Sequence, residues 1–331
     1  MIAYSLPSLL QRFFTNRLLN QLGASSHTVA GYRDTLRLLL RFAAKHFKRE
    51  PSHLRLEELD VDFLGEFLEY LESGRRNSTR TRNSRLSALR AFFRFVSFSE
   101  PGLVLHCQRV LAIPFKRYER GPVEFLAEEE TAALVAAPDP KTWIGRRDQA
   151  ILLVAVQTGL RNSEITSLCW RDVEFGTGAH VRCLGKGRKM RCTPLRSDVA
   201  AILRNWLSEG PGGPQDPVFP TLRNTRLSAD AFQRLVARHV ATACQTLPSL
   251  VKKKVTPHTL RHTAAMNLLR HGVDLSVIAL WLGHESMETT QTYLHADMRI
   301  KEQALAHSSV SGIVPNRYRA SDPLLRFLES L

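Results

Sequence analysis

Residues 256–295 read TPHTLRHTAAMNLLRHGVDLSVIALWLGHESMETTQTYLH. The Thr256-Pro257 pair is typical of a helix start, because threonine caps free N–H groups and proline tolerates the first helical position. Gly272 is placed to end this helix, and Gly283 to end a second, shorter one. The stretch predicts a run of short helices and, with them, a mainly α-helical fold.

The same stretch carries side chains suited to holding a phosphodiester. His258 and Arg261 are three residues apart, so they lie roughly 60° apart on the helix surface and can face one group of oxygens. The start of the helix also offers free N–H groups to an anion. His284 follows the second glycine, and Tyr293 comes nine residues later on a further predicted helix. These residues predict a phosphate-binding site with a tyrosine nearby.

A metal site is the alternative interpretation of the two histidines, because His258 and His262 are one helical turn apart. The metalloprotease motif requires glutamate directly after the first histidine, and Thr259 stands there instead. We therefore expect no bound metal and no cofactor.

Two further motifs precede this stretch. Thr158-Gly-Leu-Arg-Asn-Ser-Glu164 follows a strongly apolar helical segment that Gly159 is expected to end. Gly185-Lys-Gly-Arg-Lys189 is flanked by strand-like residues 180–184 and 190–195, and its paired glycines predict a β-hairpin turn. The second half of the chain should therefore be mostly helical with one small antiparallel sheet.

Composition points to a polyanionic partner. The 331 residues include 46 Lys and Arg against 31 Asp and Glu, which gives a formal net charge of +15 and a pI near 10.1. The five cysteines form no C-x-x-C pair, which argues against a disulfide framework and a zinc knuckle. No apolar run is long enough for a membrane span, so we expect a soluble, cytoplasmic protein with no membrane partner.

The first hundred residues predict a compact bundle of four helices. Ser26 opens one helical pattern, and Asp60 is expected to cap another. Seven arginines follow with no acidic residue among them. A solvated helix face is the bland alternative, but such faces usually mix charges, so we favour contact with DNA phosphates. The arginines are Arg75, Arg76, Arg80, Arg82, Arg85, Arg90 and Arg94.

Proline and glycine interrupt the pattern after residue 100. We expect a helical DNA-binding domain over residues 1–100, a basic linker over 101–123, a catalytic domain over 124–310 and a C-terminal tail over 311–331. Lys252, Lys253 and Lys254 precede the His258 helix, where phosphate contact and a solvated turn are equally good interpretations.

The motifs together resemble those of the tyrosine recombinase (phage integrase) superfamily. The segments 256–264 and 281–295 look like its C-terminal signature, 158–164 like its first arginine box, and 185–189 like its catalytic hairpin. Segments 26–33 and 84–94 are similar to its SAM-like core-binding domain. The resemblance covers almost the whole chain and favours a mobile-element or Xer-like recombinase of a bacterial nucleoid.

The resemblance implies that Tyr293 attacks a DNA phosphodiester and forms a 3′-phosphotyrosyl link. Arg161, Arg261 and His284 would neutralise the phosphate, and His258 would be an acid/base partner. Lys186, favoured over Lys189, would protonate the departing 5′ oxygen. We expect Glu164 to orient Arg161 or to begin a helix rather than to bind a metal.

Three alternatives remain at this stage. A catalytically silent DNA-binding partner in a multi-recombinase complex would not need all six residues. A type IB topoisomerase would relax DNA without recombining it, and a metal-dependent nuclease would lose activity in EDTA. The family also implies a homotetramer on paired duplex sites, possible related recombinase partners, and a tail that docks on a neighbouring protomer.

Overall fold

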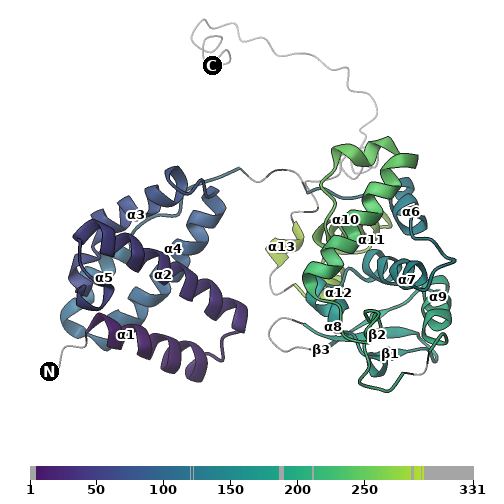
Figure 1. The fold of residues 1–331 in the computed structure, drawn as a ribbon, viewed down its shortest axis with the longest axis horizontal. Helices are drawn as coiled ribbons and strands as arrows, with labels where there is room; N and C mark the ends of the chain where they lie inside the picture. Colours follow the sequence, from purple (N-terminus) through teal and green to yellow (C-terminus); the bar gives the residue numbers. More distant parts are fainter. Residues whose placement is uncertain are drawn as a thin grey trace, which may run out of the picture. The chain divides into compact units, whose positions relative to one another are not determined.

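The computed structural model describes residues 5–119, 121, 123–185, 190–210, 212–284, 287–291 and 293, with backbone alone at 287 and 288. Lys186, Lys189 and the predicted tail over 311–331 lie outside the described residues. The chain divides into two compact units, Met1–Arg120 and Gly121–Leu331 (Figure 1). No helix in the described part is long and apolar enough to cross a membrane.

The only regular secondary structure in the described residues of the first unit is helical. Helix α4 packs against α2, α3 and α5, and their apolar faces form one core. The side chain of Asp60 accepts a hydrogen bond of 2.9 Å from the backbone N–H of Phe63, which confirms the predicted cap of α3. The helices are α1 (Leu6–Arg12), a π-helical turn (Phe13–Gln21), α2 (Ser26–Phe47), α3 (Val61–Ser73), α4 (Thr79–Ser99) and α5 (Val104–Leu111).

Helix α5 lies inside the segment that the sequence assigned to a linker. Pro101 does not start an irregular linker. It begins a 3₁₀ turn, Pro101–Leu103, that leads directly into α5. Cys107 and Val110 of α5 are buried in the core of the first unit. The linker prediction was therefore wrong for residues 101–111, because a proline in the first turn of a helix disturbs no hydrogen bond.

The second unit is mainly helical with one small sheet, as predicted. Its three strands are antiparallel in the order β1-β2-β3 (Figure 1). Leu184 stands opposite Met190 in the register of β2 and β3. The strands are β1 (Val173–Glu174), β2 (His180–Leu184) and β3 (Met190–Pro194), and the helices are α6 (Glu128–Ala136), α7 (Trp143–Thr158), α8 (Asn162–Ser167), α9 (Ser197–Leu207), α10 (Ala229–Thr246), α11 (Pro257–Arg270), α12 (Leu275–Leu282) and α13 (Met287–Gln291).

Helix α7 is the centre of this unit and packs against α6, α9 and α11. Most apolar side chains on α7 are buried, which agrees with its strongly apolar sequence. Thr256 caps α11 and Pro257 occupies its first position, as the sequence predicts. The helices that carry the candidate residues are therefore fixed to one core.

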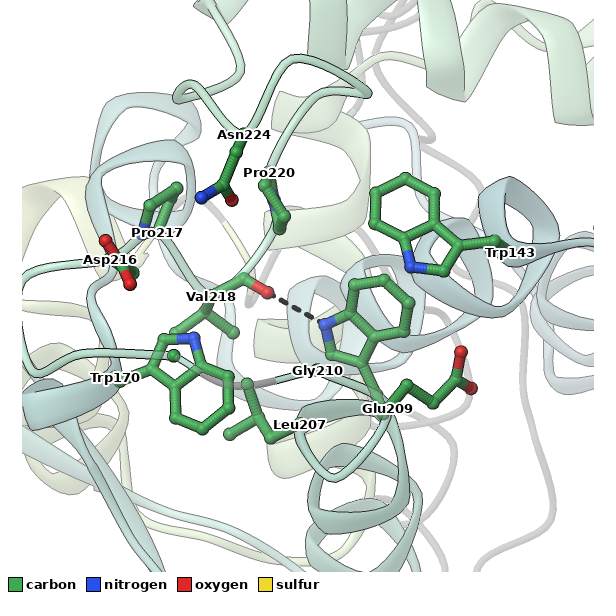
Figure 2. Close-up of a pocket in the computed structure, with 12 residues that line it drawn as sticks. Trp143, Trp170, Leu207, Glu209, Gly210, Asp216, Pro217, Val218, Pro220 and Asn224 are labelled. Carbon is green, nitrogen blue, oxygen red and sulfur yellow. Dashed lines mark hydrogen bonds between the residues drawn. The ribbon is translucent and has the colours of Figure 1, made fainter.

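Three tryptophans pack against the loop between α9 and α10. Trp143, Trp170 and Trp206 line a small cavity of about 110 Å³ (Figure 2). The indole N–H of Trp206 donates to the carbonyl of Val218 at 2.8 Å. A Cβ at Gly212 would lie 2.1 Å from the Trp170 ring, so only glycine allows this close approach. Packing of the loop accounts for these tryptophans.

Candidate active site

Arg161 is positioned by a tight turn between α7 and α8. Gly159 has a left-handed φ of 63°, and a Cβ on it would lie 2.6 Å from Leu282 Cδ2. Glycine is therefore required at this point for both backbone and packing reasons. Arg161 directly precedes α8, and its guanidinium donates to the carbonyl of Gly283 at 2.8 Å.

Glu164 is buried and is shared by two arginines. Arg161 donates to it twice, from its backbone N–H at 2.7 Å and from Nη1 at 2.8 Å. Arg191 donates twice more, from Nη1 at 3.0 Å and from Nη2 at 2.7 Å. Burial alone would raise the pKa of Glu164, but the bonds from Arg191 and Arg161 outweigh it and lower the pKa. We call Arg161, Glu164 and Arg191 the Glu164 clamp.

Arg261 is almost completely buried, with 3% of its surface exposed. It donates to the carbonyls of Gly159 and Leu282, both at 2.7 Å. Burial, together with the charge of Arg161, lowers the pKa of Arg261 to about 10, so it remains charged at neutral pH. Arg161 and Arg261 therefore bond to consecutive carbonyls in the turn after α12.

A cavity of about 340 Å³ lies where the two arginines meet. His258 lines it too, as expected for a residue in the first turn of α11, and the side chain of Asn162 bonds to the carbonyl of Ala229 beside it. A site with two guanidinium groups and a histidine is suited to an oxyanion such as phosphate. The structure thus brings together three of the residues predicted from sequence.

Tyr293 is buried and bonded to a histidine. It lies in a turn two residues beyond the end of α13, not on the helix as predicted, and 2% of its surface is exposed. Its hydroxyl is 2.9 Å from Nδ1 of His262, and the His258 ring packs edge-on against His262. Burial raises the pKa of Tyr293, and the charge of Arg261 opposes this rise.

His284 completes the described part of the site. Its ring stacks at 6.4 Å from the ring of Tyr293, and its Nδ1 is 2.8 Å from Oγ1 of Thr290. Burial and the charges of Arg261 and Arg161 lower its pKa to about 4. The histidine is therefore a neutral group at physiological pH.

Two residues that matter here were not assigned by sequence. His262 was considered only as one half of a metal pair, and Arg191 was not considered. Arg191 lies two residues before the buried Thr193 on β3, so both side chains are on the same face of the strand, and Arg191 stands opposite the buried Cys183. An arginine on the inward face of a strand needs a buried partner, and that pattern was the available signal.

The predicted DNA-contact residues divide into engaged and exposed groups. Arg82 donates to the carbonyl of Pro114 at 3.2 Å, and Arg90 stacks on Phe115. Arg85 is partly buried, and burial lowers its pKa. Lys253 forms an ion pair with Glu130 and donates to the carbonyl of Phe125, so both of these contacts lie within the second unit. The exposed residues are Arg75, Arg76, Arg80, Arg94, Lys252 and Lys254.

No group of three or more His, Cys, Asp or Glu side chains in the described part of the chain is arranged to hold a metal ion. The histidine one turn after His258 faces the tyrosine hydroxyl instead. His262 on α11 therefore has the hydroxyl of Tyr293 as its hydrogen-bond partner.

The stability of the protein should fall as the pH drops from about 6.5 to 4. Burial lowers the pKa of His262 and of His284 to about 4, with further contributions from His258, Arg261, Arg161 and Arg191. An unfolded chain binds these two protons near pH 6.5, so in this window it holds protons that the folded chain does not. We expect a loss on the order of 1 kcal/mol per histidine at pH 5, after discounting for partial exposure.

Urea denaturation at pH 7.5 and pH 5.0 measures this difference. A variant carrying His262→Asn and His284→Gln should show a clearly smaller difference between the two pH values. An equal pH dependence in the variant and the wild type would show that other groups are responsible.

Comparison with known proteins agrees with this geometry. Residues 124–300 match the Phage integrase family, and residues 11–97 match the phage integrase N-terminal SAM-like domain. The chain belongs to the phage integrase family. As a member of this family it is a tyrosine-type site-specific recombinase, and the resemblance inferred from the motifs is confirmed.

Several relatives of this phage integrase family member are similar over most of their length. It is 52% identical to the putative integrase/recombinase y4rC of Sinorhizobium fredii, over 99% of this chain and 98% of the relative. It is 33% identical to the tyrosine recombinase XerC of Pelobacter propionicus, over 87% and 90%. The fold is similar to that of the XerH recombinase bound to palindromic difH substrate, with a TM-score of 0.67 and 22% identity over 87% and 82%.

Proposed function

We propose that this protein cleaves and rejoins duplex DNA at specific sites through a covalent 3′-phosphotyrosyl intermediate on Tyr293, without ATP or metal. The proposed outcome is integration, excision or transposition of a DNA element. The observation that supports this most directly is the meeting of Arg161, Arg261 and His258 in one cavity. Tyr293 is connected to this cavity through His262, which contacts its hydroxyl and packs against His258.

The arginines match the charge that the reaction must stabilise. Negative charge builds up on the two non-bridging oxygens of a phosphodiester during attack. A guanidinium is planar and permanently charged, and it can bind two phosphate oxygens in parallel. Arg161 and Arg261 are each fixed by carbonyl contacts before DNA arrives, so little rearrangement is needed. We propose His284 as a further donor to the phosphate.

The proposed step balances protons at both ends. The phenol of Tyr293 loses its proton to the histidine pair, in which His262 contacts the hydroxyl and His258 packs against His262. The tyrosine oxygen bonds to phosphorus, the bond to the 5′ oxygen breaks, and Lys186 protonates that oxygen. A 5′-hydroxyl from a second duplex reverses the step and joins new partners.

Binding of the duplex is proposed to involve the exposed basic residues. Arg75, Arg76, Arg80 and Arg94 of the first unit are free to approach phosphates from solvent, as are Lys252 and Lys254 of the second. We propose that four protomers act on two paired sites. Phosphate contacts of this kind orient the protein and carry no sequence preference.

The proposal is tested with nicked duplexes that cover the DNA on both sides of the protein's own gene. Purified protein is incubated with each duplex in EDTA, and the products are separated on a denaturing gel. We expect a DNA-linked protein band with one of the duplexes, because the nick lets the 5′ fragment diffuse away and traps the intermediate. EDTA should leave the band unchanged.

The same experiment tests the accessory-partner and metal-dependent alternatives. A duplex that is protected in a footprint but gives no band would favour a DNA-binding accessory partner. A band that disappears in EDTA would favour metal-dependent chemistry. The topoisomerase alternative needs a second assay, on a supercoiled plasmid that carries two copies of the cleaved site, in which relaxed plasmid without recombinant junctions would favour a topoisomerase.

A further inference from the structure

Arg191 lies in the site but belongs to none of the motifs described above. It comes from β3, and 10% of its side chain is exposed, against 4% for Glu164. We propose that Arg191 is a positioning residue that acts through Glu164 and keeps the charge of Arg161 available to the DNA phosphate. This inference rests on the proposed phosphotyrosyl reaction.

Hydrogen bonding in the Glu164 clamp is complete only with Arg191. Each carboxylate oxygen of Glu164 receives one bond from Arg161 and one from Arg191. Four donors fill about four lone-pair positions, so the carboxylate has no spare acceptor. Loss of Arg191 would leave half of these positions empty in a buried place, and the carboxylate would be free to tilt and turn Arg161 with it.

The net charge of the Glu164 clamp also depends on Arg191. A pair of the partly exposed Arg161 and the buried Glu164 alone is neutral, and the glutamate would cancel the cation that the phosphate requires. With Arg191 the clamp holds two positive charges and one negative charge. One net positive charge therefore remains beside the cavity.

Packing around Arg191 ties three parts of the site together. A Cβ on Gly283 would lie 2.6 Å from Nη1 of Arg191, so the guanidinium rests on the turn whose carbonyl binds Arg161. Arg191 also stands opposite Cys183 in the β2–β3 pair, and Lys186 lies between these two strands in the sequence. The same side chain therefore joins the strand pair, the Glu164 carboxylate and the turn before Tyr293.

A direct contact with DNA is the competing role. The Nε–H of Arg191 is buried and has no hydrogen-bond partner in the described part of the chain. A phosphate oxygen could satisfy it. The two roles differ in whether the effect of Arg191 depends on Arg161.

A double-mutant cycle distinguishes these roles. Single-turnover cleavage is measured on the nicked duplex for the wild type, Arg191→Ala, Arg161→Ala and the double variant. We expect Arg191→Ala to slow cleavage about 10- to 100-fold in an otherwise wild-type chain, by analogy with residues that orient metal ligands through a hydrogen bond. In the Arg161→Ala background the same change should slow it less than about threefold, because its target is gone.

Controls and contrary outcomes complete the test. Arg182→Ala on the neighbouring strand removes an exposed arginine paired with Glu174, and it should leave the rate unchanged. Arg191→Lys keeps the charge without the two-pronged geometry, so its rate should lie between those of Arg191→Ala and the wild type. If Arg191→Ala does not fold, the cycle is run with Arg191→Lys.

Independent losses that multiply in the double variant would overturn the inference in favour of direct phosphate contact. A slower rate explained entirely by weaker DNA binding or by partial unfolding at the assay temperature would overturn it too. A wild type that forms no covalent product on any duplex would instead contradict the proposed reaction itself.

Discussion

Replacing Tyr293 with phenylalanine is expected to abolish the covalent DNA–protein product while leaving DNA binding intact. Phenylalanine lacks the oxygen that would bond to phosphorus. The ring itself packs with Met266, Ile278 and Leu282, and phenylalanine keeps that packing. The change should therefore remove the chemistry without disturbing the fold.

The cost in stability should be small and specific. The missing hydroxyl leaves Nδ1 of His262 without its partner, which we expect to lower the free energy of unfolding by about 1–3 kcal/mol. Band formation on the denaturing gel, a footprint on the same duplex and urea denaturation measure the three quantities. A covalent band of normal intensity from the Tyr293→Phe protein would assign the nucleophile to another residue.

Replacing Arg261 with alanine is expected to have the second-largest effect. It removes a fixed cation from the cavity, and loss of one such donor typically slows a reaction by about 10²- to 10³-fold. It also leaves the carbonyls of Gly159 and Leu282 unpaired in the core. We expect the free energy of unfolding to fall by at least about 2 kcal/mol.

Arg261→Lys separates charge from geometry. A lysine ammonium retains the charge but lacks the planar fork that spans both carbonyls, so it should recover part of the stability and less of the rate. Arg270→Ala removes an arginine from the last turn of the same helix, where it stacks on Phe125, and it should leave the rate unchanged. Cleavage by Arg261→Ala within threefold of the wild type would rule out the proposed role.

Sequence alone predicted the features that depend on neighbouring residues. The cap at Thr256, the left-handed turns at Gly159 and Gly283, and the cap at Asp60 follow from local backbone chemistry, and the structure has all four. The small sheet was also predictable, because its strands are adjacent in the sequence. The family signature then gave the class of enzyme.

Contacts between distant residues were beyond local reasoning. Arg191 meets Glu164 across 27 positions, and Tyr293 meets His262 across 31. Lys253 was expected to reach phosphate or solvent, but it meets Glu130, 123 positions earlier in the chain. Each depends on how helices and strands pack, which no short sequence pattern encodes. Helix α5 was missed for a different reason, since proline is compatible with both a break and a first turn.

The turn after α12 has a mechanical consequence. The carbonyls of Leu282 and Gly283 are adjacent in the chain, and Arg261 binds the first while Arg161 binds the second. The segment that leads to Tyr293 is thus anchored to both cations at a single point. A displacement of this segment would therefore break or stretch the hydrogen bonds of both arginines together. The position of the tyrosine and the positions of the two guanidinium groups are coupled in this way.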